Sequence, residues 1–232
     1  MVSGTVSSGT LIPLPRVSGF IRQVTHDVRN GLNSMDLQAA YMAELLTDPE
    51  AQEELRRLRA LIQSTARQLQ SISGNFWTAT PNFVTYSAAI LVEDLQDRLA
   101  RNFPEHAAGV EWTVELKDEH VSVDIEMLFS AITRLFDNAF NFAEEGGTIA
   151  ARAFAEDGHF ILELSETKTK VPSDPEEWGK EPFLSSRRGG YGLGIFRARA
   201  LFAVQSGELE ILHDSGRNLL LTRVTLPLAP PA

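Results

Sequence analysis

The hydrophobic and polar positions of the first third of the chain predict a long helix between about Val17 and Leu46. Apolar or small residues recur there at spacings of three and four, as in a heptad seam. The seam positions are Ile21, Val24, Val28, Gly31, Met35, Met42 and Leu45. Thr47-Asp48-Pro49 then interrupts the pattern, and proline suits the first position of a following helix.

A second helix is predicted beyond this break, because the same spacing returns without interruption. Its seam positions are Leu55, Leu58, Ile62, Thr65, Leu69, Ile72 and Phe76. Two helices with a short turn between them form an antiparallel hairpin. One hairpin has too little core to stand alone, so two copies are expected to pair as a four-helix bundle, which makes the protein a homodimer.

After Gly74 the pattern changes to short strands mixed with helices. The expected elements are a strand at 83–86, a helix at 88–101, a strand at 110–116, a helix capped by Asp124 and running to about 143, strands at 147–155 and 160–164, a helix at 193–205, and strands at 208–212 and 219–226. This order has no regular βαβ alternation, which favours an α+β sandwich with a mixed sheet. The expected organisation is a flexible N-terminus (1–16), a dimerisation hairpin (17–76) and an α/β-sandwich domain (80–228).

Composition narrows the function mainly by exclusion. The formal net charge of −10 argues against a non-specific grip on nucleic acid or anionic lipid. The chain has no cysteine, which removes disulfides, thiolate metal sites and thiol nucleophiles. No apolar run reaches the ~18 residues of a membrane span, and the first 15 residues lack the basic region of a signal peptide. The expected location is the cytoplasm.

His26 is the residue with the most distinctive chemistry. If Ile21 is position a of the seam, His26 is position f, which faces away from the packing interface. Neutral imidazole is a competent nucleophile near pH 7. A carboxylate such as Asp27 can orient the ring or take its proton, while Arg29 and Asn30 can steady phosphate oxygens. The simpler alternative is an ordinary exposed histidine on a solvated helix face.

The segment from His26 to Leu32 resembles the H-box of sensor histidine kinases, H-E/D-x-R-N/T-P-L, with Gly31 in place of the usual proline. Glycine, like proline, permits a bend in a helix. The resemblance implies that His26 is autophosphorylated and then passes its phosphoryl group to an aspartate of a response-regulator receiver domain. It assigns the catalytic site to His26, Asp27, Arg29 and Asn30.

Residues 135–142 resemble the N-box of the ATPase domain in the same family. In that family the matched asparagine, here Asn138, holds the Mg²⁺ that bridges the ATP phosphates. The earlier asparagine or histidine of the box corresponds to Arg134, which places a cation where the family has a metal ligand or base. Asn141 falls where the family often has lysine.

Two further boxes follow in the expected order. Residues 181–187 resemble the F-box, with Phe183 as its aromatic residue, and residues 188–195 resemble the G2 box at the start of a predicted helix. The glycines that the resemblance assigns to nucleotide binding are Gly190, Gly192 and Gly194. Such glycines let backbone N–H groups approach phosphates at a helix N-terminus. The implied cofactors are ATP and Mg²⁺.

Residues 166–172 stand where the family has its G1 box, D-x-G-x-G-I/V-P, and depart from it most. The family's aspartate accepts a hydrogen bond from the adenine amino group, and Glu166 takes that position. Lys168 and Lys170 replace both glycines, adding bulk where the family has none. Either the adenine site is altered, or a lysine reaches a phosphate instead.

Three functions are compatible with these motifs. The first is an active histidine kinase that uses Mg-ATP, favoured by the F-box and G2 box. The second is a histidine phosphotransferase that relays phosphate between response regulators, favoured by Arg134 and the altered G1 box. The third is a non-catalytic scaffold that binds a kinase or a regulator through its bundle.

Overall fold

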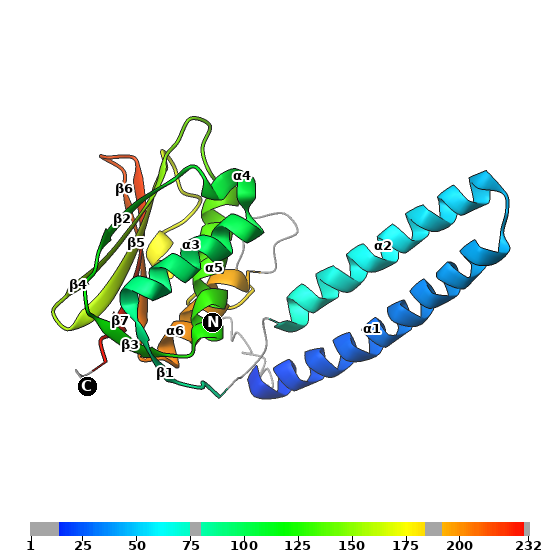
Figure 1. Cartoon of the computed structure of the whole chain (residues 1–232), viewed down its shortest axis with the longest axis horizontal. Helices are drawn as coiled ribbons and strands as arrows, with labels where there is room; N and C mark the ends of the chain where they lie inside the picture. The colour runs from blue at the N-terminus through cyan, green and yellow to red at the C-terminus, as the bar shows by residue number, and fades with distance from the viewer. Residues whose placement is uncertain (1–13, 75–79, 184–191, 230–232) are drawn as a thin grey trace, which may run out of the picture. The chain divides into compact units, whose positions relative to one another are not determined.

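The computed structural model describes residues 14–74, 80–183 and 192–229. The chain divides into two compact units, Met1–Thr78 and Ala79–Ala232. The first contains a helical hairpin and the second a sandwich of helices and strands (Figure 1). The predicted α+β fold class is confirmed.

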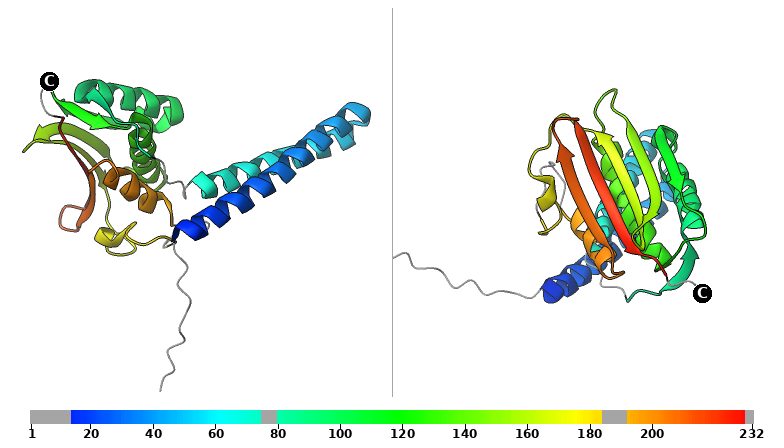
Figure 2. Two further views of the ribbon diagram at one scale, coloured as in Figure 1. Left: turned by 90° about the horizontal axis from the view of Figure 1, so that it is seen from below. Right: turned by 90° about the vertical axis from the view of Figure 1, so that its left-hand side faces the viewer.

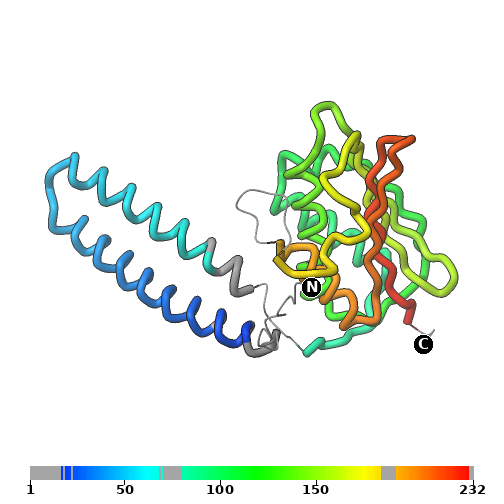
Figure 3. Tube along the Cα trace, turned by 180° about the vertical axis from the view of Figure 1, so that it is seen from behind, coloured from blue at the N-terminus to red at the C-terminus, as the bar shows by residue number. Residues whose placement is uncertain are grey.

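The hairpin consists of α1 (Leu14–Leu45) and α2 (Pro49–Gly74), which run antiparallel (Figure 3). Pro49 is the first residue of α2, as its missing N–H group favours. The Asp48 carboxylate accepts a hydrogen bond from the Ala51 N–H group at 3.0 Å, so it caps the helix. The predicted break at residues 47–49 therefore marks the turn.

The contact between the two helices is a narrow stripe of small and branched side chains. Thr25 and Ala39 of α1 and Leu55 and Ile62 of α2 are buried. The Thr25 hydroxyl donates to the Ile21 carbonyl oxygen at 2.7 Å, which satisfies it inside the stripe.

Much of the seam predicted for α1 does not lie in this stripe. Val24, Val28, Met35, Met42 and Leu45 remain between 43% and 63% exposed in the single chain. In α2, Leu58 and Thr65 of the predicted seam are also exposed. Each helix of a two-helix pair covers only one stripe of its partner, so the wider apolar surface stays uncovered. The Ile72 side chain and Phe76 fall outside what the structure describes.

The second unit is built from short elements. They are β1 (Val84–Ser87), α3 (Ala88–Asn102), α4 (Pro104–Ala107), β2 (Val110–Glu115), β3 (His120–Val123), α5 (Ile125–Asn141), β4 (Ile149–Glu156), β5 (His159–Thr167), the 3₁₀ turn η1 (Pro175–Glu177), α6 (Gly194–Ala203), β6 (Glu208–Asp214) and β7 (Leu219–Pro227). The sequence predicted neither α4 nor β3. β3 has only four residues and is held by antiparallel pairing with β1, a contact that local pattern does not reveal.

Five strands form one mixed sheet in the order β2-β4-β5-β7-β6. β2 and β4 are parallel, and the other neighbours are antiparallel. Helices α3, α5 and α6 cover one face of this sheet (Figure 2). Alternate strand residues point to the other face, which carries ion pairs such as Arg223 with Glu163 at 2.6 Å.

The turn between β4 and β5 shows why the register of this sheet is fixed. Glu156 pairs with His159, which leaves a two-residue loop of Asp157 and Gly158. Both loop residues have positive φ, 48° and 77°, as a type I′ turn requires. This turn lies between the strands predicted at 147–155 and 160–164, and glycine at position 158 adopts its positive φ without steric strain.

The core lies between the helix layer and the sheet. Its largest fully buried side chains include Phe136 of α5, Phe160 of β5 and Phe202 of α6. Phe136 stacks on Trp112 of β2, with ring centroids 5.6 Å apart. These contacts fix α5 and α6, which carry the N-box and G2-box residues, against the same sheet.

Asp124 joins three segments of this unit and supports a testable expectation. Its carboxylate accepts from the Met127 N–H group at 3.0 Å, as an N-cap, and from the Asn82 N–H group at 2.8 Å. Its own N–H group donates to the buried Gln205 side chain at 2.8 Å.

Asp124→Ala should lower the free energy of unfolding by about 1–2 kcal/mol, measured by chemical denaturation. Asp97→Ala, at an exposed position within α3, should change it by less than about 0.5 kcal/mol. Equal effects of the two changes would contradict the capping role.

Candidate functional site

The sequence-predicted site residues fall into two groups, one on each unit. His26, Asp27, Arg29 and Asn30 lie on α1, and the side chains of all four are exposed. The His26 side chain is 67% exposed, as predicted from its position f. An incoming protein can therefore reach the imidazole without any rearrangement of the hairpin.

The imidazole of His26 is oriented by the carboxylate beside it. His26 Nδ1 lies 3.1 Å from Asp27 Oδ1 and 3.4 Å from the Asn30 side-chain nitrogen. Nδ1 cannot donate to the carboxylate and accept from the amide at the same time. The shorter, charge-assisted contact favours donation to Asp27. That tautomer leaves the lone pair on Nε2, which is then the nucleophilic nitrogen.

Asp27 is suited to hold this tautomer. The hydrogen bonds from His26 and then from Gln23 lower the pKa of its carboxyl group below the usual value, so it is anionic at neutral pH. Gln23 donates to both carboxylate oxygens, at 3.0 and 3.1 Å, which fixes their direction. Arg29 makes no hydrogen bond or ion pair with His26 among the described contacts, so the structure leaves it available to an incoming group.

On the second unit, the N-box side chains of α5 form a chain of polar contacts. Arg134 Nη1 pairs with Asp137 Oδ2 at 3.1 Å, and the Asn141 amide donates to Asp137 Oδ1 at 2.8 Å. Asn138 is half-buried one turn beyond Arg134. The guanidinium next to this position opposes a divalent cation there by like-charge repulsion.

The N-terminus of α6 faces Arg134 across a narrow space. A Cβ atom on Gly194 would lie 3.2 Å from Arg134 Cδ, so glycine permits this approach. Gly192 has a φ of +64°, a conformation that glycine adopts readily. Leu193, at the N-cap, provides no side-chain cap, so the first N–H groups of α6 keep their capacity to bind an anion.

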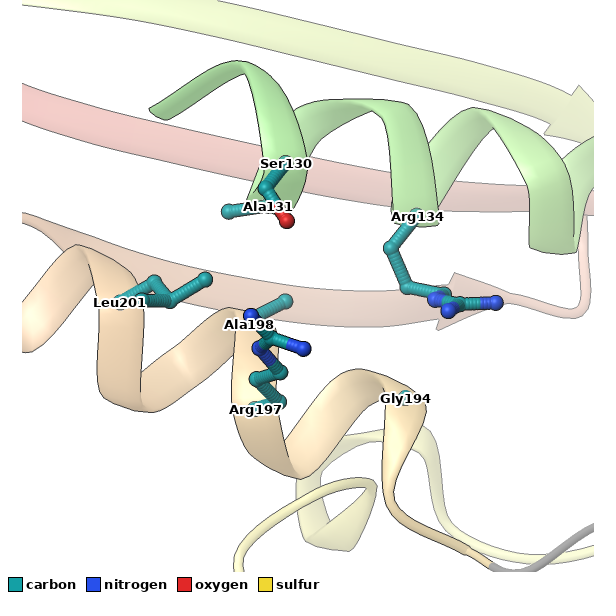
Figure 4. A pocket seen from close by; sticks show the side chains of 7 residues that line it. All are labelled: Ser130, Ala131, Arg134, Gly194, Arg197, Ala198 and Leu201. Carbon is teal, nitrogen blue, oxygen red and sulfur yellow. The ribbon is translucent and has the colours of Figure 1, made fainter. Parts of the chain in front are cut away.

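Arg197 is a functional candidate that the sequence reading missed. Its Nε is buried without a hydrogen-bond partner, and it lines a cavity of about 20 Å³ with Ser130, Arg134 and Gly194. Figure 4 shows Arg134 of α5 and Arg197 of α6 both in this cavity lining. Burial and the neighbouring Arg134 lower the pKa of the Arg197 guanidinium. The sequence offered only that Arg197 and Arg199 flank Ala198 in a helix of otherwise apolar or small residues, and this does not single out Arg197.

A larger open depression of about 480 Å³ adjoins this cavity between α3 and α5. Its lining is Arg98, Asn102, Phe103, Glu126, Ser130, Thr133, Arg134 and Asp137. The lining mixes both signs of charge, so it does not define one ligand class.

Glu166, the expected acceptor for adenine, is already paired. Its carboxylate Oε2 lies 3.2 Å from Lys168 Nζ, and both side chains are more than nine-tenths buried. The contact is an ion pair without good hydrogen-bond alignment at Oε2. Lys168 also donates to the carbonyl oxygen of Phe142, at the end of α5. Burial raises the pKa of Glu166 above its usual range, and the ammonium opposes that rise.

The segment that follows β5, at Lys168 and Thr169, is also held by hydrogen bonds of its backbone. The Lys168 N–H group donates to the Asn218 carbonyl oxygen at 2.8 Å, and His213 Nε2 lies 2.9 Å from the Lys168 carbonyl oxygen. Glu144 accepts from the N–H group and the hydroxyl of Thr169, at 2.9 and 3.0 Å. Glu166 and Lys168 therefore do not fit a base-binding loop of the family type, whereas Gly192 and Gly194 fit a phosphate-binding helix start.

The remaining predicted site residues differ in how much the structure shows. Phe183 is exposed and has a φ of +69°. Gly190 lies outside the described residues, as does most of the F-box. Lys170, the second replaced glycine, is exposed. Within the described ranges, no group of three or more His, Cys, Asp or Glu side chains could hold a metal ion. No helix within those ranges combines the length and apolar character needed to cross a bilayer.

This fold and these motifs define a class of protein, the sensor histidine kinases, to which the chain is similar in sequence. It is 24% identical over 221 residues to the sensor histidine kinase GlrK of Escherichia coli K12, covering 90% of this chain and 46% of GlrK. It is also 24% identical over 235 residues to the sensory histidine kinase/phosphatase NtrB of Rhodobacter capsulatus, covering 91% of this chain and 62% of NtrB. No family model matches the chain.

Solved structures show the same fold. Full-length ShkA in complex with AMPPNP superposes with a TM-score of 0.72 at 19% identity, over 93% of this chain and 47% of ShkA. The histidine kinase ThkA in complex with the response regulator TrrA gives 0.59 at 15% identity, over 88% of this chain and 60% of that one. The resemblance to the sensor histidine kinase family is confirmed. The chain spans about half the length of the first curated relatives it matches.

Proposed function

We propose that this chain is a two-component phosphotransfer protein in which His26 carries the phosphoryl group. The observation that carries the proposal is the exposed imidazole, whose Nδ1 is held by the Asp27 carboxylate at 3.1 Å. The Nε2 lone pair attacks phosphorus, the bond from phosphorus to the donor oxygen breaks, and Asp27 stabilises the positive charge that develops on the ring. In this proposal the phosphoryl oxygens are bound by Arg29 and Asn30, which are exposed polar side chains within one turn of His26.

The acceptor of the phosphoryl group is an aspartate on the receiver domain of a response regulator. The crystal structure of ThkA with TrrA supports this choice of partner by fold similarity. His26 meets the requirement of access for such a domain, because its side chain on α1 is 67% exposed. Transfer back to an aspartate restores neutral His26 for the next cycle.

The working form is a homodimer. The apolar side chains of α1 that remain exposed in one chain recur at spacings of three, four and seven, which matches a bundle seam. A second hairpin would cover them and complete a four-helix bundle. His26 at position f stays outside that interface, so dimer formation and access to the histidine are compatible.

Two phosphoryl donors are compatible with this proposal, Mg-ATP and a phosphorylated response regulator. Mg-ATP is the donor of a histidine kinase, and similarity to ShkA with bound AMPPNP supports it, together with the free N-terminus of α6. In that case the backbone at Gly192 and Gly194 would receive the phosphates. Asn138 would hold Mg²⁺, which would neutralise part of the phosphate charge and so favour phosphoryl transfer. A phosphorylated response regulator is the donor of a phosphotransferase. The buried Glu166–Lys168 pair favours this second donor.

The test is to label the purified chain from each donor separately. One sample receives Mg-ATP with labelled γ-phosphate, and another receives a receiver domain that was charged with labelled acetyl phosphate. We expect acid-labile, base-stable label on the chain from the receiver domain. Label from Mg-ATP would instead establish the kinase. Absence of label from both donors would contradict the proposal and leave a scaffold role.

A further inference from the structure

We infer that the Lys168 side chain occupies the space beside Glu166 where the G1-box resemblance places the nucleotide base, here called the base pocket. Adenine nucleotides therefore do not bind there. The inference deepens the proposed function, on which it rests for its meaning, by assigning the donor to a phosphorylated protein. It depends on three observations: the partners of the Lys168 ammonium, its burial, and the fastening of its backbone.

The first observation concerns what the ammonium contacts. By the resemblance of residues 166–172 to a G1 box, the Glu166 carboxylate would accept a hydrogen bond from the adenine amino group. Lys168 Nζ lies 3.2 Å from that carboxylate and donates to the Phe142 carbonyl oxygen. An ammonium paired with a carboxylate is a stronger donor than a neutral amine, and it belongs to the same chain. To bind Glu166, the adenine amino group would have to displace the Lys168 ammonium, which is a stronger donor and is covalently part of the chain.

The second observation is burial. The side chains of Lys168 and Glu166 are 9% and 8% exposed. Removing the ammonium from this position would leave a buried carboxylate without its counter-charge, which is strongly unfavourable. The alternative that Lys168 reaches a phosphate is excluded by the same geometry, because its ammonium is already engaged in the interior.

The third observation is that the segment has little freedom to swing away. The backbone of Lys168 is held by Asn218 and His213 of the β6–β7 hairpin region, and Thr169 is held by Glu144. Moving this segment as a whole would break these four hydrogen bonds, the hydrogen bond from Lys168 to Phe142 and the ion pair. The Lys170 side chain, in contrast, is exposed and makes no ion pair among the described residues.

The experiment is an equilibrium titration of the purified 232-residue chain with two probes, Mg-ATP and adenosine, up to about 1 mM. Adenosine reports on the base pocket alone, whereas Mg-ATP also reports on the phosphate-binding start of α6. The variants are Lys168→Gly and the double change Glu166→Asp/Lys168→Gly, which restores the aspartate and the first glycine of a family G1 box. Lys170→Gly, at the other replaced glycine, is the matched control.

We expect no saturable binding of either probe to the wild type or to Lys170→Gly. The variants that lack Lys168 should gain affinity for both probes by tenfold or more, which corresponds to about 1.4 kcal/mol or more. Circular dichroism confirms that each variant is folded. A folded Lys168→Gly or double variant without any gain would overturn the inference.

The wild type alone also decides the question if the variants unfold. Saturable binding of Mg-ATP or adenosine below about 1 mM to the wild type would overturn the inference, and absence of binding of both supports it. Label transfer from a receiver domain to His26 is measured separately on the same preparation. The proposed phosphotransfer function can therefore fail while the closed pocket stands, or the reverse.

Discussion

Replacing His26 by alanine should remove all acid-labile phosphate from the chain, whichever donor supplies it. No neighbouring side chain on α1 offers a comparable nucleophile, because Asp27 and Asn30 lack a basic lone pair of this kind at neutral pH. The hairpin itself should be unaffected, since the His26 side chain is 67% exposed and supports no core contact. The measurement is label on the chain after incubation with a charged receiver domain or with labelled Mg-ATP.

The matched control is His159→Ala, which removes another exposed histidine, at the β4–β5 turn, and should leave labelling unchanged. Asp27→Asn gives a graded result. The amide still accepts a hydrogen bond from Nδ1 but carries no charge, so the rate of labelling should fall by roughly 10–100-fold while the final amount is retained. Full labelling of His26→Ala would place the phosphoryl group on another residue and refute the assigned site.

The second large effect is expected from Ile62→Asp in α2. Ile62 is 9% exposed and lies in the contact between the helices, so its replacement buries an unpaired carboxylate. The cost should be several kcal/mol, which exceeds what a single hairpin can absorb. We expect the variant to lose much of its helical circular dichroism and to elute as a monomer or as aggregate in size-exclusion chromatography with light scattering.

Ala60→Asp is the control for this experiment, because it adds the same charge two residues away at an exposed position of the same helix. It should keep the dimer and the helix content of the wild type. If Ile62→Asp also formed a normal dimer, the four-helix bundle would be wrong.

The hairpin illustrates how far periodicity alone can reach. The spacing of apolar residues predicted two helices and the break at 47–49, since these depend on contacts within a few turns of the chain. It did not separate the stripe that faces the partner helix of the same chain from the stripe left for another copy. Thr25 and Ala39 are buried, whereas Val24 and Met35 of the predicted seam are exposed. Both stripes recur with the same seven-residue period, so the period alone does not tell which of them faces the other helix of the hairpin. Only the packed hairpin distinguishes them.

The candidate sites divide in a similar way. The order of the boxes can be read directly from the chain. The exposed position of His26 and the carboxylate beside it were also predictable, because they depend on neighbours along one helix. It also showed that Arg134, Lys168 and Lys170 depart from the family pattern. The tertiary structure decided what those departures do. Lys168 reaches Phe142, 26 residues away in the sequence, and Arg197 approaches Arg134 from another helix.

The physical reason is the range of the interactions involved. A helix, its cap and its exposed face follow from backbone hydrogen bonds and side chains three or four residues apart. Whether a lysine is a solvated charge or a buried ion-pair partner depends on which distant carboxylate and carbonyl the fold brings to it. The sequence therefore predicted His26 as the phosphoryl carrier, and only the fold showed that Glu166, the expected acceptor for adenine, is paired with Lys168.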